Sequence, residues 1–382
     1  MTDEPIPTKR ARSEAPVPRA ARPFDVDNCY LTTLEVKDAD GKQVVLDSGI
    51  GLAFCHATGQ LALSDCFYLH GRSAGSVSAF LLDREKGTGT PSFVEQWKLP
   101  RPTHLDLDDE YMFGFGSGLG LSGALAFTED GPPLLLAADH GRHAVHVIDP
   151  VHGSSLGHLV PEGTIVAPRG VSTQGSMVAV SFWRNRTPGN SGVALFQRTG
   201  DLAWTALWSV TYSPVKDWYE FRCPNNIRIA KDGEHIAVSF SDGNDSVLLL
   251  DAKNGDAVGY LAAELGNVWD MEECQDGWLV SCVSNFTSEY TVYFVGTRDT
   301  GKDGVGLRQT RLPTKPRSDF AHVQAVALVL VPGLGLVART TRPRRPLALF
   351  TTPDLAAMGA MSGLRVAWIT VVVRGVFRRA RK

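Results

Sequence analysis

The chain has 382 residues, of which 43% are hydrophobic and 21% charged, and its formal net charge is −3. This balance is typical of a soluble globular protein with an adequate core, which excludes a chain that is disordered throughout. The six cysteines form no C-x-x-C pair and no zinc-finger spacing, so we expect a reducing compartment and small buried thiols.

The N-terminal segment, residues 1–23, contains five prolines and no aromatic residue. Too little of it can be buried to offset the ordering of its backbone, so we predict a disordered tail. It has no apolar stretch of the kind that directs secretion, and Lys9, Arg10 and Arg12 resemble a short nuclear-import signal. We therefore expect an intracellular protein, cytoplasmic or nuclear.

One pattern then recurs six times: an apolar strand, a turn, a strand of alternating apolar and small residues, a polar turn, and a third β-rich strand. The second strands of the six copies read LALSD, LLAAD, VAVSF, IAVSF, WLVSC and GLVAR, and should be centred near Ala62, Leu136, Ala179, Ala237, Leu279 and Val337. Repeats of about 40 to 50 residues with several strands each are typical of propeller blades. The sequence thus predicts an all-β fold, a six-bladed β-propeller over residues 24–351.

Three segments fall outside the repeats. Residues 30–36 form a lone predicted strand, which could supply the missing outer strand of the sixth blade and so close the ring. Residues 100–120 form an insertion in which four acids, at 106 and 108–110, lack the order of a calcium-binding EF-hand loop. Residues 352–382 form a basic tail with helical spacing, although the β-branched run at 369–373 favours a strand instead.

The second copy, residues 135–149, resembles the NHL repeat. Asp139, Gly141, His143 and the apolar run that ends at Asp149 match that pattern in place, and Pro168-Arg169-Gly170-Val171 is similar to the start of the family's next blade. The resemblance implies a six-bladed NHL-like propeller, and only this copy carries it strongly. NHL propellers often serve as substrate-recognition ends of ubiquitin ligases, and others bind single-stranded RNA. Because this chain lacks the cysteine pairs of a RING, the first role could only be that of an adaptor.

Six-bladed propellers also include metal-dependent hydrolases and lactonases, which hold a divalent ion on Glu, Asn and Asp at the starts of innermost strands. Pro224-Asn225-Asn226-Ile227 is similar to their P-N-G-[IL] pattern, so Asn226 could be one ligand. The first blade offers Ser48-Gly49 instead of a Glu, and Asp270 lies one position from the matching place. No G-x-S-x-G motif and no dinucleotide-binding glycine pattern occurs, so we expect no catalytic residue, no metal and no cofactor.

We instead predict a non-catalytic binding platform. In a four-stranded blade, the turn after the second strand and the connection to the next blade lie on the same side of the ring. We call this side the arginine face, because it gathers arginines and aromatic residues, as protein-binding and single-stranded nucleic-acid sites do. Its predicted residues are Arg72, Arg142, Arg169, Trp183, Arg184, Arg186, Trp218, Tyr219, Phe221, Asn225, Asn226, Trp269, His322, Arg342, Arg344 and Arg345. The expected partner of this monomeric propeller is a protein or peptide with anionic groups, with single-stranded RNA as the alternative.

Overall fold

The computed structural model describes most of the repeat region. The described residues are 30–45, 51–69, 72–83, 92–99, 124–140, 143–161, 163–183, 191–211, 224–240, 247–262, 267–274, 277–283, 290–296, 309–311, 325–331, 334–340 and 347–351. All regular structure within these ranges is β-strand. They contain no helix of the length and hydropathy that a bilayer crossing requires. The predicted tails, at 1–23 and 352–382, and the acidic insertion lie outside the described residues.

Four sheets of four strands each follow the chain in simple order. Their strands are β6 (Leu125–Phe127), β7 (Leu135–Asp139), β8 (Ala144–Ile148), β9 (Ser155–His158); β10 (Pro168–Gln174), β11 (Met177–Trp183), β12 (Ser191–Gly200), β13 (Ala203–Thr211); β14 (Pro224–Ile229), β15 (His235–Phe240), β16 (Val247–Asp251), β17 (Ala257–Ala262); and β18 (Asn267–Cys274), β19 (Gly277–Val283), β20 (Tyr290–Gly296), β21 (Gln309–Arg311).

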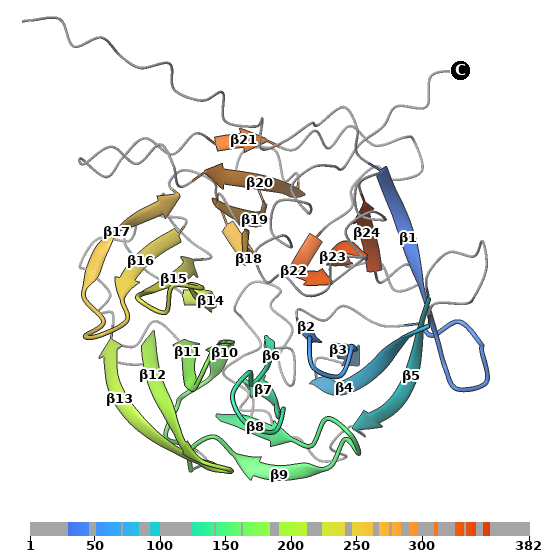
Figure 1. Ribbon diagram of the computed structural model, residues 1–382, viewed down its shortest axis with the longest axis horizontal. Coiled ribbons are helices and arrows are strands. Elements are labelled where there is room, and N and C mark those ends of the chain that lie inside the picture. The colour runs from blue at the N-terminus through green and yellow to red at the C-terminus, as the bar shows by residue number, and fades with distance from the viewer. Residues whose placement is uncertain are drawn as a thin grey trace, which may run out of the picture.

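The remaining strands form one eight-stranded sheet in the order β2-β3-β4-β5-β1-β24-β23-β22. Their bounds are β1 (Tyr30–Lys37), β2 (Leu52–Cys55), β3 (Gln60–Leu69), β4 (Arg72–Asp83), β5 (Ser92–Leu99), β22 (Ala325–Val331), β23 (Gly335–Thr340) and β24 (Leu347–Thr351). Figure 1 shows the sheets arranged radially about a common centre, with β2, β6, β10, β14, β18 and β22 nearest to it. These innermost strands contact one another in chain order, and β22 contacts β2. This architecture is that of a β-propeller.

The predicted second strands are confirmed. Each of their six predicted centres lies within β3, β7, β11, β15, β19 or β23. All six residues at these centres are buried. Small residues alternate with large ones there because the second strand is enclosed by sheets on both sides, and its two faces must fit against different neighbours.

The hydrophobic core lies between adjacent sheets. Val178 and Val180 of β11 pack with Val145 and Val147 of β8. From the same strand, Ala179 packs into a separate cluster with Ile227 of β14. Successive residues of one strand therefore serve two interfaces, which is why no single sheet can fold alone.

The lone N-terminal strand pairs as expected. Residues 30–34 of β1 pair antiparallel with β24, and residues 35–37 pair parallel with β5. Leu34 and Val36 are each 1% exposed and belong to the core between the two halves of the eight-stranded sheet. The first described strand thus joins the last strands of the repeat region to the first.

Two tryptophans, in β5 and β13, each fix a turn of a neighbouring sheet. Trp208 Nε1 of β13 donates to the carbonyl of Ala252 (2.8 Å), and Trp97 Nε1 of β5 donates to the carbonyl of Pro150 (2.7 Å). Gly255 and Gly153, with φ of +79° and +69°, lie against these two indoles. Residues 149–153 and 251–255 are equivalent turns in which an aspartate carboxylate accepts a backbone N–H two residues on.

We expect Gly255→Ala to destabilise the protein by overpacking this contact. An added Cβ would lie 2.9 Å from the Trp208 ring and 3.0 Å from a methyl of Val210. The matched control is Gly163→Ala, because Gly163 has φ of +80° but an added Cβ there would meet no described atom within 4 Å. Both variants carry the strain of a left-handed backbone, so urea denaturation should show an extra loss of about 1–3 kcal/mol for Gly255→Ala alone. Equal losses would show that the indole moves aside freely.

Candidate functional site

The innermost strands carry an equivalent backbone position in four sheets. A buried serine of the second strand accepts a hydrogen bond from a backbone N–H in the innermost strand or directly before it. The pairs are Gly51–Ser64 (2.7 Å), Gly170–Ser181 (2.9 Å), Asn226–Ser239 (2.9 Å) and Asp270–Ser281 (3.1 Å). In β10, β14 and β18 the register shifts at this point, which marks a β-bulge. The serine hydroxyl satisfies the amide that the bulge turns away from the ladder.

This geometry corrects one sequence expectation. From spacing along the chain, Asp270 lies one position from the place that matches Asn226. In the structure, however, Asn226 donates its N–H to Ser239 and Asp270 donates its N–H to Ser281, so the two residues occupy equivalent places. The bulge between Val268 and Asp270 shifts the register, and sequence spacing does not reveal it. The other two equivalent positions are glycines, so the four places together supply two side chains.

Asp270 is fully buried and is surrounded by hydrogen-bond donors. Its Oδ1 accepts from Asn226 Nδ2 (2.6 Å) and from the N–H of Met271 (2.7 Å), and its Oδ2 accepts from the N–H of Leu328 (2.7 Å). Arg228 Nη2 lies 2.9 Å from Oδ1 and 3.0 Å from Oδ2. Strands β14, β18 and β22 thus meet on one carboxylate, which we call the Asp270 cluster.

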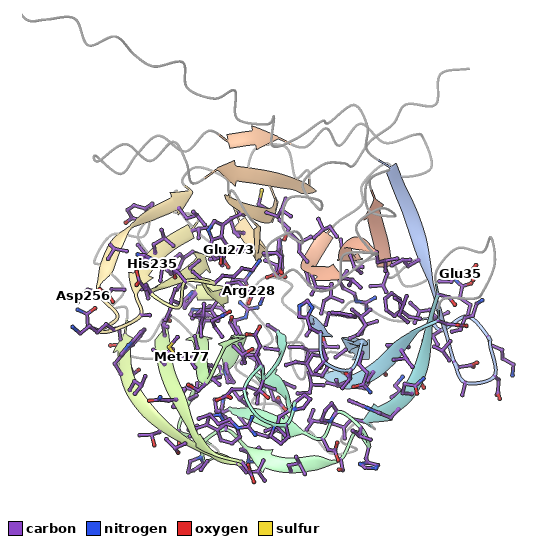
Figure 2. The ribbon with its side chains drawn as sticks, in the orientation of Figure 1. Glu35, Met177, Arg228, His235, Asp256 and Glu273 are labelled. Atoms are coloured by element: carbon purple, nitrogen blue, oxygen red, sulfur yellow. The ribbon has the colours of Figure 1, made fainter. Side chains whose placement is uncertain are left out.

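Arg228 connects the Asp270 cluster to Glu272. Its Nε donates to the carbonyl of Met271 (2.8 Å) and lies 3.7 Å from Glu272 Oε2. Figure 2 shows Arg228 where β14 and β18 approach the centre of the ring. Burial raises the pKa of Asp270, against the opposing effects of the Arg228 charge and the amides of Leu328 and Met271. The donors nevertheless fill both oxygens, which is the arrangement that an ionised carboxylate requires.

The ionisation of Glu272 should affect the stability of the protein in a pH range that can be measured. Burial raises its pKa from 4.5 to about 7, although Arg228 and Lys231 favour the charged form. The folded protein therefore holds the proton of Glu272 more tightly than the unfolded chain does. The contribution of this proton to the free energy of unfolding is fully present below pH 4.5 and is lost as the pH rises through about 7. Its side chain is 20% exposed, so water offsets part of the cost of the charge.

We expect Glu272→Gln to stabilise the protein at alkaline pH. The variant should exceed wild type in free energy of unfolding by about 2 kcal/mol near pH 8 and by little near pH 5. Denaturation curves at several pH values measure this difference, and Glu234→Gln, at an exposed glutamate, is the matched control. A constant difference between Glu272→Gln and wild type across this range would contradict the prediction.

The Asp270 cluster does not offer a cation site. Asn226 Oδ1 accepts the N–H of Ile227 (2.8 Å), and its Nδ2 is committed to Asp270. Arg228 already neutralises Asp270 and would repel a metal ion. A second group, Asp232, Glu234 and His235, has ligand atoms within 4.8 Å of one another, but it lies on one exposed turn where Asp232 bonds His235 (2.9 Å). Turn formation accounts for that group.

The described part of the arginine face contains an aromatic and cationic cluster. Arg169 lies with its guanidinium carbon 5.2 Å from the centre of a Trp183 ring, within cation–π range. His140 lies 6.4 Å from Trp183 and bonds the carbonyl of Ala167 through Nδ1 (3.2 Å). The indole N–H groups of Trp183 and Trp269 are buried and have no hydrogen-bond partner among the described residues. Buried indole donors usually have one.

The other predicted residues of this face are placed as follows. Arg169, Asn225 and Asn226 are buried, and Asn225 Nδ2 donates to the carbonyl of Val268 (2.9 Å) across to β18. Trp183 and Trp269 are partly exposed, and Arg72 begins β4. The remaining ones lie outside the described residues: Arg142, Arg184, Arg186, Trp218, Tyr219, Phe221, His322, Arg342, Arg344 and Arg345.

Sequence reasoning did not single out Arg228 or Glu272. Both are two residues beyond a polar residue of an innermost strand, in the patterns Asn226-x-Arg228 and Asp270-x-Glu272. Residues at this spacing share one face of a strand, so the two patterns could have indicated facing groups on adjacent sheets.

No family model matches the sequence, and no curated protein matches it. Among solved structures, the chain is similar to a periplasmic gluconolactonase of Pseudomonas aeruginosa, with 14% identity over 71% of this chain and 75% of that chain and a TM-score of 0.49. It is also similar to the WD40 β-propeller domain of Doa1, with 9% identity over 79% of this chain and 78% of that chain and a TM-score of 0.44. These values are too low to transfer a function.

Proposed function

We propose that residues 24–351 form a six-bladed propeller that acts as a non-catalytic binding platform through its arginine face. Six blades follow if the eight-stranded sheet is divided at β1, with β2–β5 as the first blade and β22–β24 completed by β1 as the sixth. The antiparallel register of β1 with β24 supports this division, because outer blade strands pair in this way.

The observation that carries the proposed function is the cluster of Arg169 and Trp183. In this cluster the partly exposed Trp183 lies against the buried Arg169, and the indole N–H of Trp183 has no hydrogen-bond partner in the described part of the chain. Arg184 follows Trp183 directly in the sequence, and Arg186 comes two residues later, so both would add charge near it. Arginine and tryptophan dominate the binding energy of protein interfaces, so an acidic peptide or protein surface is the partner that this chemistry favours.

The hydrolase alternative receives less support from the side chains. The residues at the four equivalent inner positions are two glycines, Asn226 and Asp270, and the last two bond each other. A catalytic divalent ion needs ligands that converge on an open position. Binding is therefore the better account of these residues. A ubiquitin-pathway adaptor would be a special case of such a binding platform, and an RNA-binding protein would be a competing outcome.

The proposal predicts that charge reversal on the arginine face removes the partner. The variant Arg142→Glu, Arg184→Glu, Arg344→Glu should fold normally and recover much less partner in affinity capture from the native cell. Each contact to an anion loses a charge-assisted bond of about 1.5–3 kcal/mol. Protein is identified by mass spectrometry and RNA by sequencing, and direct titration with the purified partner measures the loss.

Single reversals provide a matched control. Arg184→Glu should weaken binding, whereas Lys253→Glu should not, because Lys253 is exposed in the turn after β16 at the opposite end of the sheets. If both variants recover equal amounts of partner, the arginine face is only a solvated surface. RNA recovered in place of protein would favour the nucleic-acid alternative. Chelator-sensitive lactone or ester hydrolysis that is lost in Asn226→Ala would establish the enzyme alternative.

A further inference from the structure

Two histidines and a buried aspartate lie together in the sheet of β6–β9, a different sheet from those that form the Asp270 cluster. His146 of β8 pairs directly with His158 of β9, and Asp139 ends the neighbouring strand β7. Asp139 Oδ2 and His146 Nε2 are 2.9 Å apart. The side chains of Asp139 and His146 are 1% and 12% exposed, whereas His158 is exposed. We call these three residues the His146 cluster.

The buried pair stands where other sheets have uncharged, mostly apolar residues. Asp139 ends the second-strand copy LLAAD, and His146 pairs with the third residue of that copy. The residues at the place of Asp139 in the next three sheets are Phe182, Phe240 and Cys282, and those at the place of His146 in the next two are Ala194 and Leu248, all buried. Burying a carboxylate costs free energy unless it is paired. Packing alone therefore does not account for the Asp139–His146 pair.

Asp139 fixes the orientation of the His146 ring. An ionised carboxylate only accepts hydrogen bonds, so Nε2 donates to it and the neutral imidazole keeps a lone pair on Nδ1. Among the described residues, neither His146 Nδ1 nor a ring nitrogen of His158 has a hydrogen-bond partner. Histidines that bind metal ions commonly donate their other ring N–H to a carboxylate in this way, which sets the tautomer and makes the free nitrogen more basic.

The separation of the two rings is that of two imidazoles on one ion. A metal–nitrogen bond of about 2.0–2.1 Å places the ring centres of two bound histidines about 4.5–5.2 Å apart, for angles between square-planar and tetrahedral. The ring centres of His146 and His158 are 4.9 Å apart, with an angle of 65° between the ring planes. Their facing positions on adjacent antiparallel strands hold the two side chains at this separation.

The cluster can be reached from the rim of the ring. Figure 1 shows β9 at the rim, outside β8. All four residues of β9 are exposed, including His158. Water can therefore complete the coordination of an ion held by two histidines. Imidazole ligands suit zinc, copper and nickel, whereas magnesium and calcium prefer oxygen ligands.

We propose that His146 and His158 bind a divalent transition-metal ion that prefers nitrogen ligands, such as Zn²⁺ or Cu²⁺, with Asp139 as the carboxylate that orients His146. The ion joins the outer strand β9 to β8, and a ligand that binds only the folded state raises the melting temperature. This inference departs from the sequence-based expectation that the chain binds no metal. It does not rest on the proposed function of the arginine face.

The test is titration of the purified full chain with Zn²⁺ by isothermal calorimetry. Wild type should bind zinc, and His146→Ala and His158→Ala should each lose this site. His158→Ala should keep the metal-free melting temperature, because its side chain is exposed, and zinc should no longer raise that temperature. Asp139→Asn, if its melting temperature shows a folded protein, should bind zinc about 10–100-fold more weakly.

Matched controls are His152→Ala and His235→Ala, which should bind zinc as wild type does. Each of these histidines also bonds an aspartate, Asp149 (2.8 Å) or Asp232 (2.9 Å), but in an exposed turn. Electron paramagnetic resonance of bound Cu²⁺ should show coupling to two imidazole nitrogens in wild type and to one in His158→Ala. No zinc binding by wild type, equal affinity and stoichiometry in His158→Ala, or loss of the site in His152→Ala or His235→Ala would overturn the proposal.

Discussion

Asp270→Ala is expected to lower the free energy of unfolding by about 3–5 kcal/mol, the loss seen when one partner of a buried ion pair is removed. The substitution leaves the Arg228 guanidinium without its carboxylate in a site where the Arg228 side chain is 14% exposed. It also leaves the N–H groups of Leu328 and Met271 and the amide of Asn226 without their acceptor. Urea denaturation followed by tryptophan fluorescence measures the loss.

A double-mutant cycle separates the ion pair from the other bonds. Arg228→Met should be destabilising on its own, because it leaves Asp270 buried without its counter-charge. The double variant Asp270→Ala, Arg228→Met should lose less than the two single variants together, since no unpaired charge then remains. Additive losses would mean that Arg228 reaches solvent when Asp270 is absent. A loss below about 1 kcal/mol for Asp270→Ala would show that this cluster does not hold β14, β18 and β22 together.

Deleting residues 1–38 is expected to lower the melting temperature sharply, whereas deleting residues 1–23 should leave it nearly unchanged. The longer deletion removes β1, and with it the pairing to both β24 and β5. It also removes Leu34 and Val36 from the core, and burial of such side chains contributes about 1.5–3 kcal/mol each. Two sheet edges would then be open next to each other, which favours aggregation as well as unfolding.

Differential scanning calorimetry of the two truncations provides the comparison. The shorter truncation is the matched control, because it removes only the predicted disordered tail and keeps all of β1. Equal melting temperatures for the two proteins would show that another segment closes the ring. A double substitution, Leu34→Ser with Val36→Ser, should reproduce part of the effect within the full chain, because polar groups would then be buried in this core.

The second strands could be predicted because their cause is local. Ile236-Ala237-Val238-Ser239 alternates large and small residues since each side chain meets one of two neighbouring sheets, and this alternation is visible in the sequence. The role of residues 30–36 followed from counting strands: the last repeat lacked an outer strand and one strand was left over. The first inference depends on a pattern within a short window of sequence, and the second depends on the number of strands along the chain.

The inner site depended on tertiary structure. The equivalence of Asn226 and Asp270 rests on bulges, and a bulge changes register without a distinctive residue to mark it. The sequence by itself determined the β-strand repeats and the presence of Asn226 and Asp270 near the starts of two innermost strands. Only the tertiary structure decided that Asp270 is enclosed by donors from three sheets, because burial and pairing depend on contacts between residues distant in the chain.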